Sequence, residues 1–195
     1  MAEPRDRREL ILSTAAEMFA RSGLRATTVR EIADAVGVFS GSLYHHFPSK
    51  DAILEEVLSR YLEEIRARYA EVLASGKPPA ECLHDLVVTS LAVAEEQPHA
   101  TAIYQNEAQY LRENPAFREI QKAAARIQQT WLQVIETGVA DGTFREDIPA
   151  WVFYRLIRDA LWLSIRWHRP DGPYSTGQLA EDVTFLFLHG FAAPG

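Results

Sequence analysis

The stretch "VREIADAVGVFSGSLYHHF", residues 29–47, decides the fold. Two helices joined by a tight turn need a small residue where they cross, a glycine in the turn and an apolar residue that anchors the second helix. Ala33, Gly37 and Leu43 supply these in order, four and six residues apart. Gly37 can take the positive φ that such a turn demands. The stretch therefore predicts a helix-turn-helix whose second helix covers about residues 39–46.

The same helical pattern extends over nearly the whole chain. Apolar residues recur every three or four positions, and no alternating run bounded by turn residues indicates a sheet. We therefore predict an all-α fold with nine helices. They are expected at about 6–22, between a Thr27 or Thr28 cap and Gly37, at 39–46, from a Ser49 cap to 74, and at 80–97, 98–113, 115–141, 149–168 and 177–191.

Composition limits the class of protein. The chain has 195 residues, of which 47% are hydrophobic and 24% charged, enough for a packed core in a protein of ordinary polarity. No apolar run approaches the roughly 20 residues of a membrane span, and the N-terminus lacks the apolar stretch of a signal peptide. The single cysteine, Cys82, excludes an internal disulfide and a thiolate zinc cluster. We therefore expect a cytoplasmic protein without a membrane partner.

The charge is unevenly distributed along the chain. Residues 1–50 carry seven Lys and Arg against six Asp and Glu, a net charge of +1. Residues 51–195 carry thirteen against twenty-one, a net charge of −8. The local potential governs encounter with a polyanion, so the N-terminal segment can meet nucleic acid although the whole chain carries −7.

The paired histidines His45 and His46 suggest either a metal site or an outward polar face. Neighbours on a helix diverge by about 100°, and no carboxylate or cysteine lies one turn away, so we predict no metal site. On a helix that reads DNA, tyrosine and histidine can donate to phosphate oxygens, while serine can approach base edges. If the helix-turn-helix binds DNA, the residues expected to contact it are Thr27, Thr28, Ser40, Gly41, Ser42, Tyr44, His45 and Lys50.

The predicted helix 149–168 has an unusual composition. At 100° per residue, Trp151, Arg155, Arg158, Trp162 and Arg166 fall on one side, and the rest of the circumference is mostly apolar. Three interpretations stay open: a solvated arginine stripe, a subunit interface, or an anionic ligand site lined by arginine and tryptophan. The last two can coexist.

Two segments, "AAEMFARSGLRATTVREIADAVGV" and "SGSLYHHFPSKDAIL", resemble the signature of the TetR family of transcriptional regulators. The resemblance implies a DNA-binding domain over residues 1–50 and an effector-binding and dimerisation domain over residues 51–195. It further implies a repressor that dimerises through helices 149–168 and 177–191. Since each subunit offers few phosphate contacts, two copies on a palindromic operator are expected.

A narrower resemblance concerns the effector. "IYQNEAQYL" (103–111) and "LIRDALWLSIRWHRPDGP" (156–173) resemble the TetR-family repressors of late (ring C/D) cholesterol catabolism, which respond to a CoA thioester of a steroid remnant. Such a ligand needs arginines for its phosphates and an apolar cavity for its acyl end. The predicted ligand-binding residues are Arg158, Trp162 and Arg166, together with seven residues that are each also plausible as core residues: Tyr61, Leu86, Ser90, Tyr104, Gln105, Ala108 and Trp131.

Other functions are weighed against this one. The sequence shows no nucleophile elbow, phosphate-binding glycine loop or His-Glu-x-x-His motif, so we expect no enzyme, no catalytic residues and no cofactor. A DNA-binding protein without a small-molecule ligand is a second alternative. The main alternative is a TetR-type repressor that responds to a fatty acyl-CoA or another apolar small molecule, such as a drug.

Overall fold

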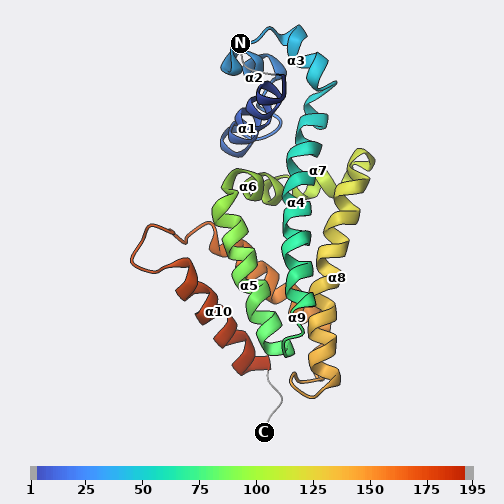
Figure 1. Ribbon diagram of the computed structural model, residues 1–195, viewed down its shortest axis with the longest axis vertical. Helices are drawn as coiled ribbons and strands as arrows, with labels where there is room; N and C mark the ends of the chain where they lie inside the picture. Colours follow the sequence, from blue (N-terminus) through green and yellow to red (C-terminus); the bar gives the residue numbers. More distant parts are fainter. Residues whose placement is uncertain (1–3, 192–195) are drawn as a thin grey trace. The chain divides into compact units, whose positions relative to one another are not determined.

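The computed structural model describes residues 4–191, and every regular element in that range is helical. The predicted all-α fold is therefore confirmed, with ten α-helices in place of nine within the described range. The elements, labelled in Figure 1, are α1 (Pro4–Ser22), α2 (Val29–Val36), α3 (Ser40–His46), α4 (Lys50–Ala74), α5 (Pro79–Glu96), α6 (Pro98–Asn106), α7 (Ala108–Glu113), the 3-10 turn η1 (Pro115–Phe117), α8 (Arg118–Ala140), α9 (Ala150–Ser164) and α10 (Thr176–Phe191).

The tenth helix arises from a break that was not predicted. The expected helix 98–113 divides into α6 and α7 at Glu107, whose φ of −97° and ψ of 11° leave the helical range. The carboxylate of Glu107 accepts a hydrogen bond from the Leu24 main-chain N–H at 3.2 Å. This contact joins residues 83 positions apart, so hydrophobic periodicity could not reveal it.

Tertiary contacts divide the chain into two compact units. The described part of the first comprises residues 4–62 and 97–122. Here α1 packs against α2 and α6, and α2 packs against α3. The core of the N-terminal helices is made of large apolar side chains that are at most 3% exposed, among them Ile11, Phe19, Leu24, Ile32, Leu43, Phe47 and Leu54.

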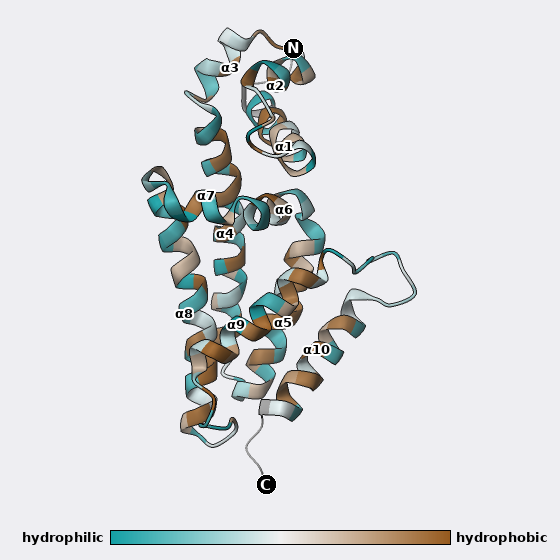
Figure 2. Cartoon of the chain, turned by 180° about the vertical axis from the view of Figure 1, so that it is seen from behind, coloured by the Kyte–Doolittle hydropathy of each residue, from teal (hydrophilic) through white to brown (hydrophobic). Residues whose placement is uncertain are grey.

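The second unit comprises residues 63–96 and, in its described part, 123–191. In it α5 packs against α10 and α9, and the ribbon of both α9 and α10 is coloured as hydrophobic over several segments in Figure 2. Its buried side chains include Leu83, Val87, Trp131, Ile135, Phe153, Ile157, Leu161 and Leu179. Within residues 4–191 no helix is long and apolar enough to cross a membrane.

The division of function at residue 50 stays a prediction. Residues 51–62 belong by their contacts to the same compact unit as α1–α3. The outermost residues of the two predicted domains, 1–3 and 192–195, lie outside the described part of the chain.

Candidate nucleic-acid interface and effector site

The α2–α3 pair is built from local signals. Thr28 caps α2: its hydroxyl accepts the Glu31 N–H at 3.2 Å, and the Glu31 carboxylate accepts the Thr28 N–H at 2.8 Å. Gly37 ends α2 with φ of 75°, a conformation that residues with a β-carbon rarely adopt. Ala33 and Leu43 are fully buried. The three residues that predicted the helix-turn-helix therefore have the environments that the motif requires.

The outward face of α3 is polar. Tyr44 is 52% exposed, and Gly41 and His45 are also exposed, whereas Ser40 and Ser42 are half-buried. On the inner side Leu43 and Phe47 are buried, which fixes the orientation of the helix. This arrangement can bring hydroxyl and imidazole groups to a DNA duplex. Contact of these side chains with DNA stays a prediction.

Two other predicted DNA contacts take part in the fold. The ammonium of Lys50, at the start of α4, donates to the main-chain carbonyls of Leu24 and Thr27 at 2.5 and 2.9 Å. Thr27 is 2% exposed, and its hydroxyl donates to the Gly23 carbonyl at 2.9 Å. Thr28, by contrast, is exposed. Lys50 thus holds the α1–α2 turn against α4, and its phosphate contact stays a prediction, as do those of Thr27 and Thr28.

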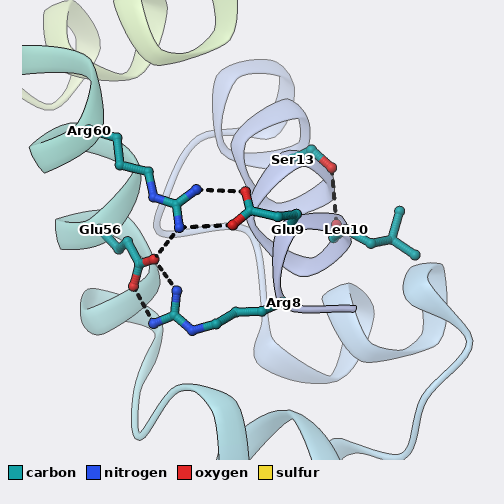
Figure 3. Close-up of polar contacts among 6 residues, drawn as sticks. All are labelled: Arg8, Glu9, Leu10, Ser13, Glu56 and Arg60. Carbon is teal, nitrogen blue, oxygen red and sulfur yellow. Dashed lines mark hydrogen bonds and ion pairs between the residues drawn. The ribbon is translucent and has the colours of Figure 1, made fainter. Parts of the chain in front are cut away.

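Four alternating charges connect α1 to α4 (Figure 3). Arg8 pairs with Glu56 through both guanidinium nitrogens, and Arg60 donates to Glu56 at 2.8 Å and to Glu9 at 2.6 and 2.9 Å. The guanidinium of Arg8 also lies 4.4 Å from the centre of the Phe47 ring. The hydrogen bond from Arg8 lowers the pKa of Glu56 below its ordinary value. The network therefore fixes α1 on α4 through charged hydrogen bonds.

The α6–α7 segment contacts the same region of the first unit. Besides the bond from Leu24 to Glu107, the Tyr110 hydroxyl donates to the Asp51 carboxylate at 3.0 Å. Burial first, and then the hydrogen bond to Asp51, raises the pKa of Tyr110. A displacement of α6 or α7 would therefore strain or break hydrogen bonds to the α1–α2 turn and to the first turn of α4.

In the second unit, three predicted effector residues, Trp131, Arg158 and Trp162, lie in a row with two further aromatic residues, Tyr69 and Tyr154. The Tyr69 and Trp131 rings lie 6.0 Å apart, and the Trp131 and Tyr154 rings 6.3 Å apart. The guanidinium of Arg158 lies 5.7 Å from the Tyr154 ring and 5.4 Å from the Trp162 ring. Arg158 is thus held between two aromatic faces by cation–π contacts.

A hydrogen-bond chain completes this row. The Ser90 hydroxyl donates to the Leu86 carbonyl at 2.6 Å, so the Tyr69 hydroxyl, 2.5 Å from the Ser90 oxygen, is the donor in that pair. Burial raises the pKa of Tyr69 to about 12, and the hydroxyl is therefore neutral at physiological pH. Leu86 is fully buried.

The remaining predicted effector residues lie in the first unit. The Tyr61 and Tyr104 rings are 6.1 Å apart, and the Tyr61 hydroxyl accepts a hydrogen bond from Thr101 at 3.2 Å. Tyr61 is 4% exposed, while Gln105 and Ala108 are half-buried. The structure therefore distributes the predicted ligand residues over two units, and their role in ligand binding stays a prediction.

The predicted arginine stripe ends earlier than expected. The helix expected over residues 149–168 ends at Ser164, which is buried and whose hydroxyl donates to the Leu161 carbonyl at 2.6 Å. The main-chain N–H groups of Trp167 and His168 both donate to the Ser164 carbonyl. Arg166 therefore lies beyond α9, so the predicted helix end at residue 168 was wrong, and the role of Arg166 in ligand binding stays a prediction.

Two surface hollows lie in the second unit, of about 620 and 320 Å³. Residues of α8 line the larger, and residues of α4 and α5 and Ser75 line the smaller; neither contains a predicted ligand residue. Within residues 4–191 no three His, Cys, Asp or Glu side chains gather as metal ligands, and the absence of a metal site stays a prediction.

An apolar surface covers α9 and α10. We define this α9–α10 surface by the apolar side chains of the two helices that are more than half exposed: Trp151, Leu156, Leu163, Phe185 and Leu186. Single exposed apolar side chains are common on monomeric proteins, whereas contiguous patches of them are typical of interaction sites.

Comparison with known proteins identifies the family. Residues 11–57 match the sequence profile of bacterial regulatory proteins of the tetR family, and residues 76–191 match that of the tetracyclin repressor-like C-terminal domain. The chain belongs to the TetR family. It is accordingly a transcriptional regulator with a helix-turn-helix and not an enzyme, as predicted.

Among members of the TetR family, the chain is similar to the HTH-type transcriptional repressors KstR2. It is 41% identical to KstR2 of Rhodococcus jostii over 188 residues, which cover 96% of this chain and 92% of that protein. It is also 41% identical to KstR2 of Mycobacterium tuberculosis over 189 residues, which cover 97% and 94%. The structure of the ketosteroid transcriptional regulator KstR2 of M. tuberculosis matches with a TM-score of 0.89 at 39% identity, covering 100% of this chain and 98% of that one.

Residues that the TetR resemblance did not indicate stand out in the structure. Tyr154 could have been found from sequence, because it precedes Arg158 by one helical turn. Tyr69, Glu107 and the Arg8–Glu56 pair could not, since their partners lie 21 to 83 residues away. The helix-turn-helix can be predicted from residues that are close in sequence, whereas the effector region depends on contacts between residues far apart in sequence.

Proposed function

We propose that this protein is a homodimeric repressor that binds a palindromic operator and is released from it by an acyl-CoA thioester of a steroid ring-degradation intermediate. The observation that carries the DNA-binding part is the polar outward face of α3, held by the buried Leu43 and Phe47. Similarity to KstR2 repressors along nearly the whole chain supports steroid catabolism as the regulated process. The site of action is then the bacterial cytoplasm, where the operator lies.

The α9–α10 surface is the proposed dimer interface. Its exposed apolar side chains include Trp151 on α9 and Leu186 on α10, and their burial against a second copy would remove a large apolar area from water. A pair of α3 helices is needed because each subunit offers few phosphate contacts.

Arg158 supports the assignment of a CoA thioester. The domain around it is acidic, so a polyphosphate ligand needs a local cation whose charge is not neutralised by a buried carboxylate. Arg158 donates to the half-exposed Asp159 that follows it and lies between two aromatic rings. The alternative, a fatty acyl-CoA or another apolar small molecule, would use the same aromatic row, and a neutral ligand would not need the arginine.

Release follows from a shift between two conformations. A ligand that binds the DNA-incompetent conformation more tightly raises its population by its differential affinity and by no more. The contacts of Glu107 and Tyr110 with the α1–α2 turn and α4 are a route for such a shift within the first unit.

Two experiments test this function. Gel-shift titration compares the full operator, obtained by selection from random duplexes, with a single half-site, and we expect strong loss of affinity on the half-site. Undiminished affinity there would contradict a dimeric repressor. Thermal-shift screening compares acyl-CoA thioesters with their free acids, and stabilisation by the free acids alone would contradict recognition of CoA.

A further inference from the structure

Phe39 is the most exposed large apolar side chain among residues 7–190. It is 90% exposed and stands directly before α3. Leaving a phenyl ring in water forgoes the free energy that its burial would supply, because apolar surface is stabilised by removal from water. A side chain that only terminated the turn would not need this size.

Phe39 also breaks a second local rule, because it occupies the N-cap of α3. Its backbone is extended and its carbonyl accepts the N–H groups of Ser42 and Leu43 at 2.9 and 3.2 Å, but no side chain caps the helix. A Ser, Thr, Asp or Asn here would satisfy one of the free N–H groups. The neighbouring helices are capped in this way, α2 by Thr28 and α4 by Ser49.

The residues that follow Phe39 are small. The first three residues of α3 are Ser40, Gly41 and Ser42, and a β-carbon built on Gly41 meets nothing within 4 Å. The ring is thus the bulkiest group at the end of the helix that carries the DNA-facing residues. A residue that violates both burial and capping preferences at one position is typical of a functional site.

The major groove offers one apolar group to such a ring, the C5-methyl of thymine. We propose that Phe39 determines operator specificity by packing its ring against a thymine methyl in the major groove. The proposal rests on the proposed function as a DNA-binding repressor. It assigns to the α2–α3 turn an apolar base contact beside the polar contacts predicted for α3.

A methyl scan of the DNA tests the proposal. An operator is selected from random duplexes with the full-length protein, and each dT is then replaced singly by dU, which lacks the methyl. We expect one position per half-site at which dU weakens wild-type binding by about fourfold, the value of one buried methyl-sized group. The Phe39→Ala protein should bind about tenfold more weakly than wild type and should not distinguish dT from dU at that position.

The Phe39→Ser variant separates a contact with DNA from a structural role. Serine restores the missing cap, so the melting temperature should rise or stay unchanged while operator affinity falls as in Phe39→Ala. Val88→Ala, which truncates an exposed apolar side chain on α5, is the matched control and should bind as wild type.

Three results would overturn the proposal. Wild-type affinity of both Phe39 variants would show that the ring does not touch DNA. Equal sensitivity to dU in wild type and Phe39→Ala would assign the methyl contact to another residue. A strong fall in the melting temperature of Phe39→Ser would assign the ring to the fold. Failure of the wild type to select any DNA would instead refute the proposed function, and this inference with it.

Discussion

Replacement of Arg158 by methionine tests the effector site most sharply. Its guanidinium donates to the neighbouring Asp159, whose side chain is 54% exposed and stays solvated without it, and also interacts with Tyr154. The loss includes two cation–π contacts, at 5.7 and 5.4 Å, of about 0.5–1 kcal/mol each. Methionine retains apolar contact with both rings, so we expect a net cost of about 1 kcal/mol and a fall in Tm of about 2–4 °C.

The effect on ligand binding should be much larger. A charge-assisted hydrogen bond to a phosphate or carbonyl oxygen contributes about 1.5–3 kcal/mol, which corresponds to a loss of affinity of about 10- to 150-fold. Isothermal titration with an acyl-CoA thioester measures this loss, and sedimentation velocity reports the oligomeric state. Operator affinity without ligand should be unchanged.

Arg155→Met is the matched control. Arg155 lies one turn earlier on α9, is exposed, and has a single ring contact, with Trp151 at 6.0 Å. Its replacement should leave CoA thioester affinity within about twofold. Equal ligand affinity of Arg158→Met and wild type would refute the assigned role, and a dissociated Arg158→Met protein would place the side chain in the dimer interface.

Substitutions of Glu56, Lys50 and Tyr44 test the first unit. Glu56→Gln should lower the free energy of unfolding by about 1–2 kcal/mol at pH 7 in chemical denaturation, because it breaks a charged network. The control Glu63→Gln, which breaks an exposed pair with Arg66 on α4, should cost less than about 0.5 kcal/mol. Equal costs would contradict a structural role of the network. The hydrogen bond from Arg8 lowers the folded-state pKa of Glu56. The contribution of Glu56 to the free energy of unfolding is therefore fully present above about pH 4.3 and is lost as the pH falls through the lowered pKa. In an acid titration the wild type should accordingly lose more stability than Glu56→Gln. Lys50→Met should lower Tm measurably because two main-chain carbonyls lose their donor, and an unchanged Tm with reduced operator affinity would mean that the ammonium serves DNA alone. Tyr44→Phe should weaken operator binding by a similar factor on all operator sequences, with stability within about 0.5 kcal/mol of wild type, and a strong fall in Tm with intact binding would assign the half-exposed hydroxyl to the fold.

The helix-turn-helix could be predicted because its determinants are local. The Thr28 cap with Glu31 three residues later and the glycine of the turn act within one or two helical turns. These residues can be recognised from their spacing in the sequence, and the structure adds the distances between their atoms. The buried Ala33 and Leu43 confirm the prediction.

The effector region could be predicted less well, because its geometry depends on tertiary contacts. α9 ends at Ser164, four residues before the end expected from the pattern, and Arg166 lies beyond it. The bond from Leu24 to Glu107 crosses 83 residues, and the break that it accompanies is not visible in periodicity. Lys50 was assigned to DNA on chain position alone, whereas its ammonium is engaged by two carbonyls.

Release of the operator by an acyl-CoA thioester tests the central claim most directly. Fluorescence anisotropy follows a labelled operator, held at saturation by the wild-type protein, during titration with the CoA thioester of a bicyclic steroid remnant, and in parallel with its free acid. To move the complex from 99% bound to 1% bound, the ligand must favour the DNA-incompetent state by about 10⁴-fold. We predict that the anisotropy falls to the value of free DNA with the thioester and stays high with the acid. Anisotropy that stays at the bound value, while calorimetry shows the thioester bound, would contradict the account.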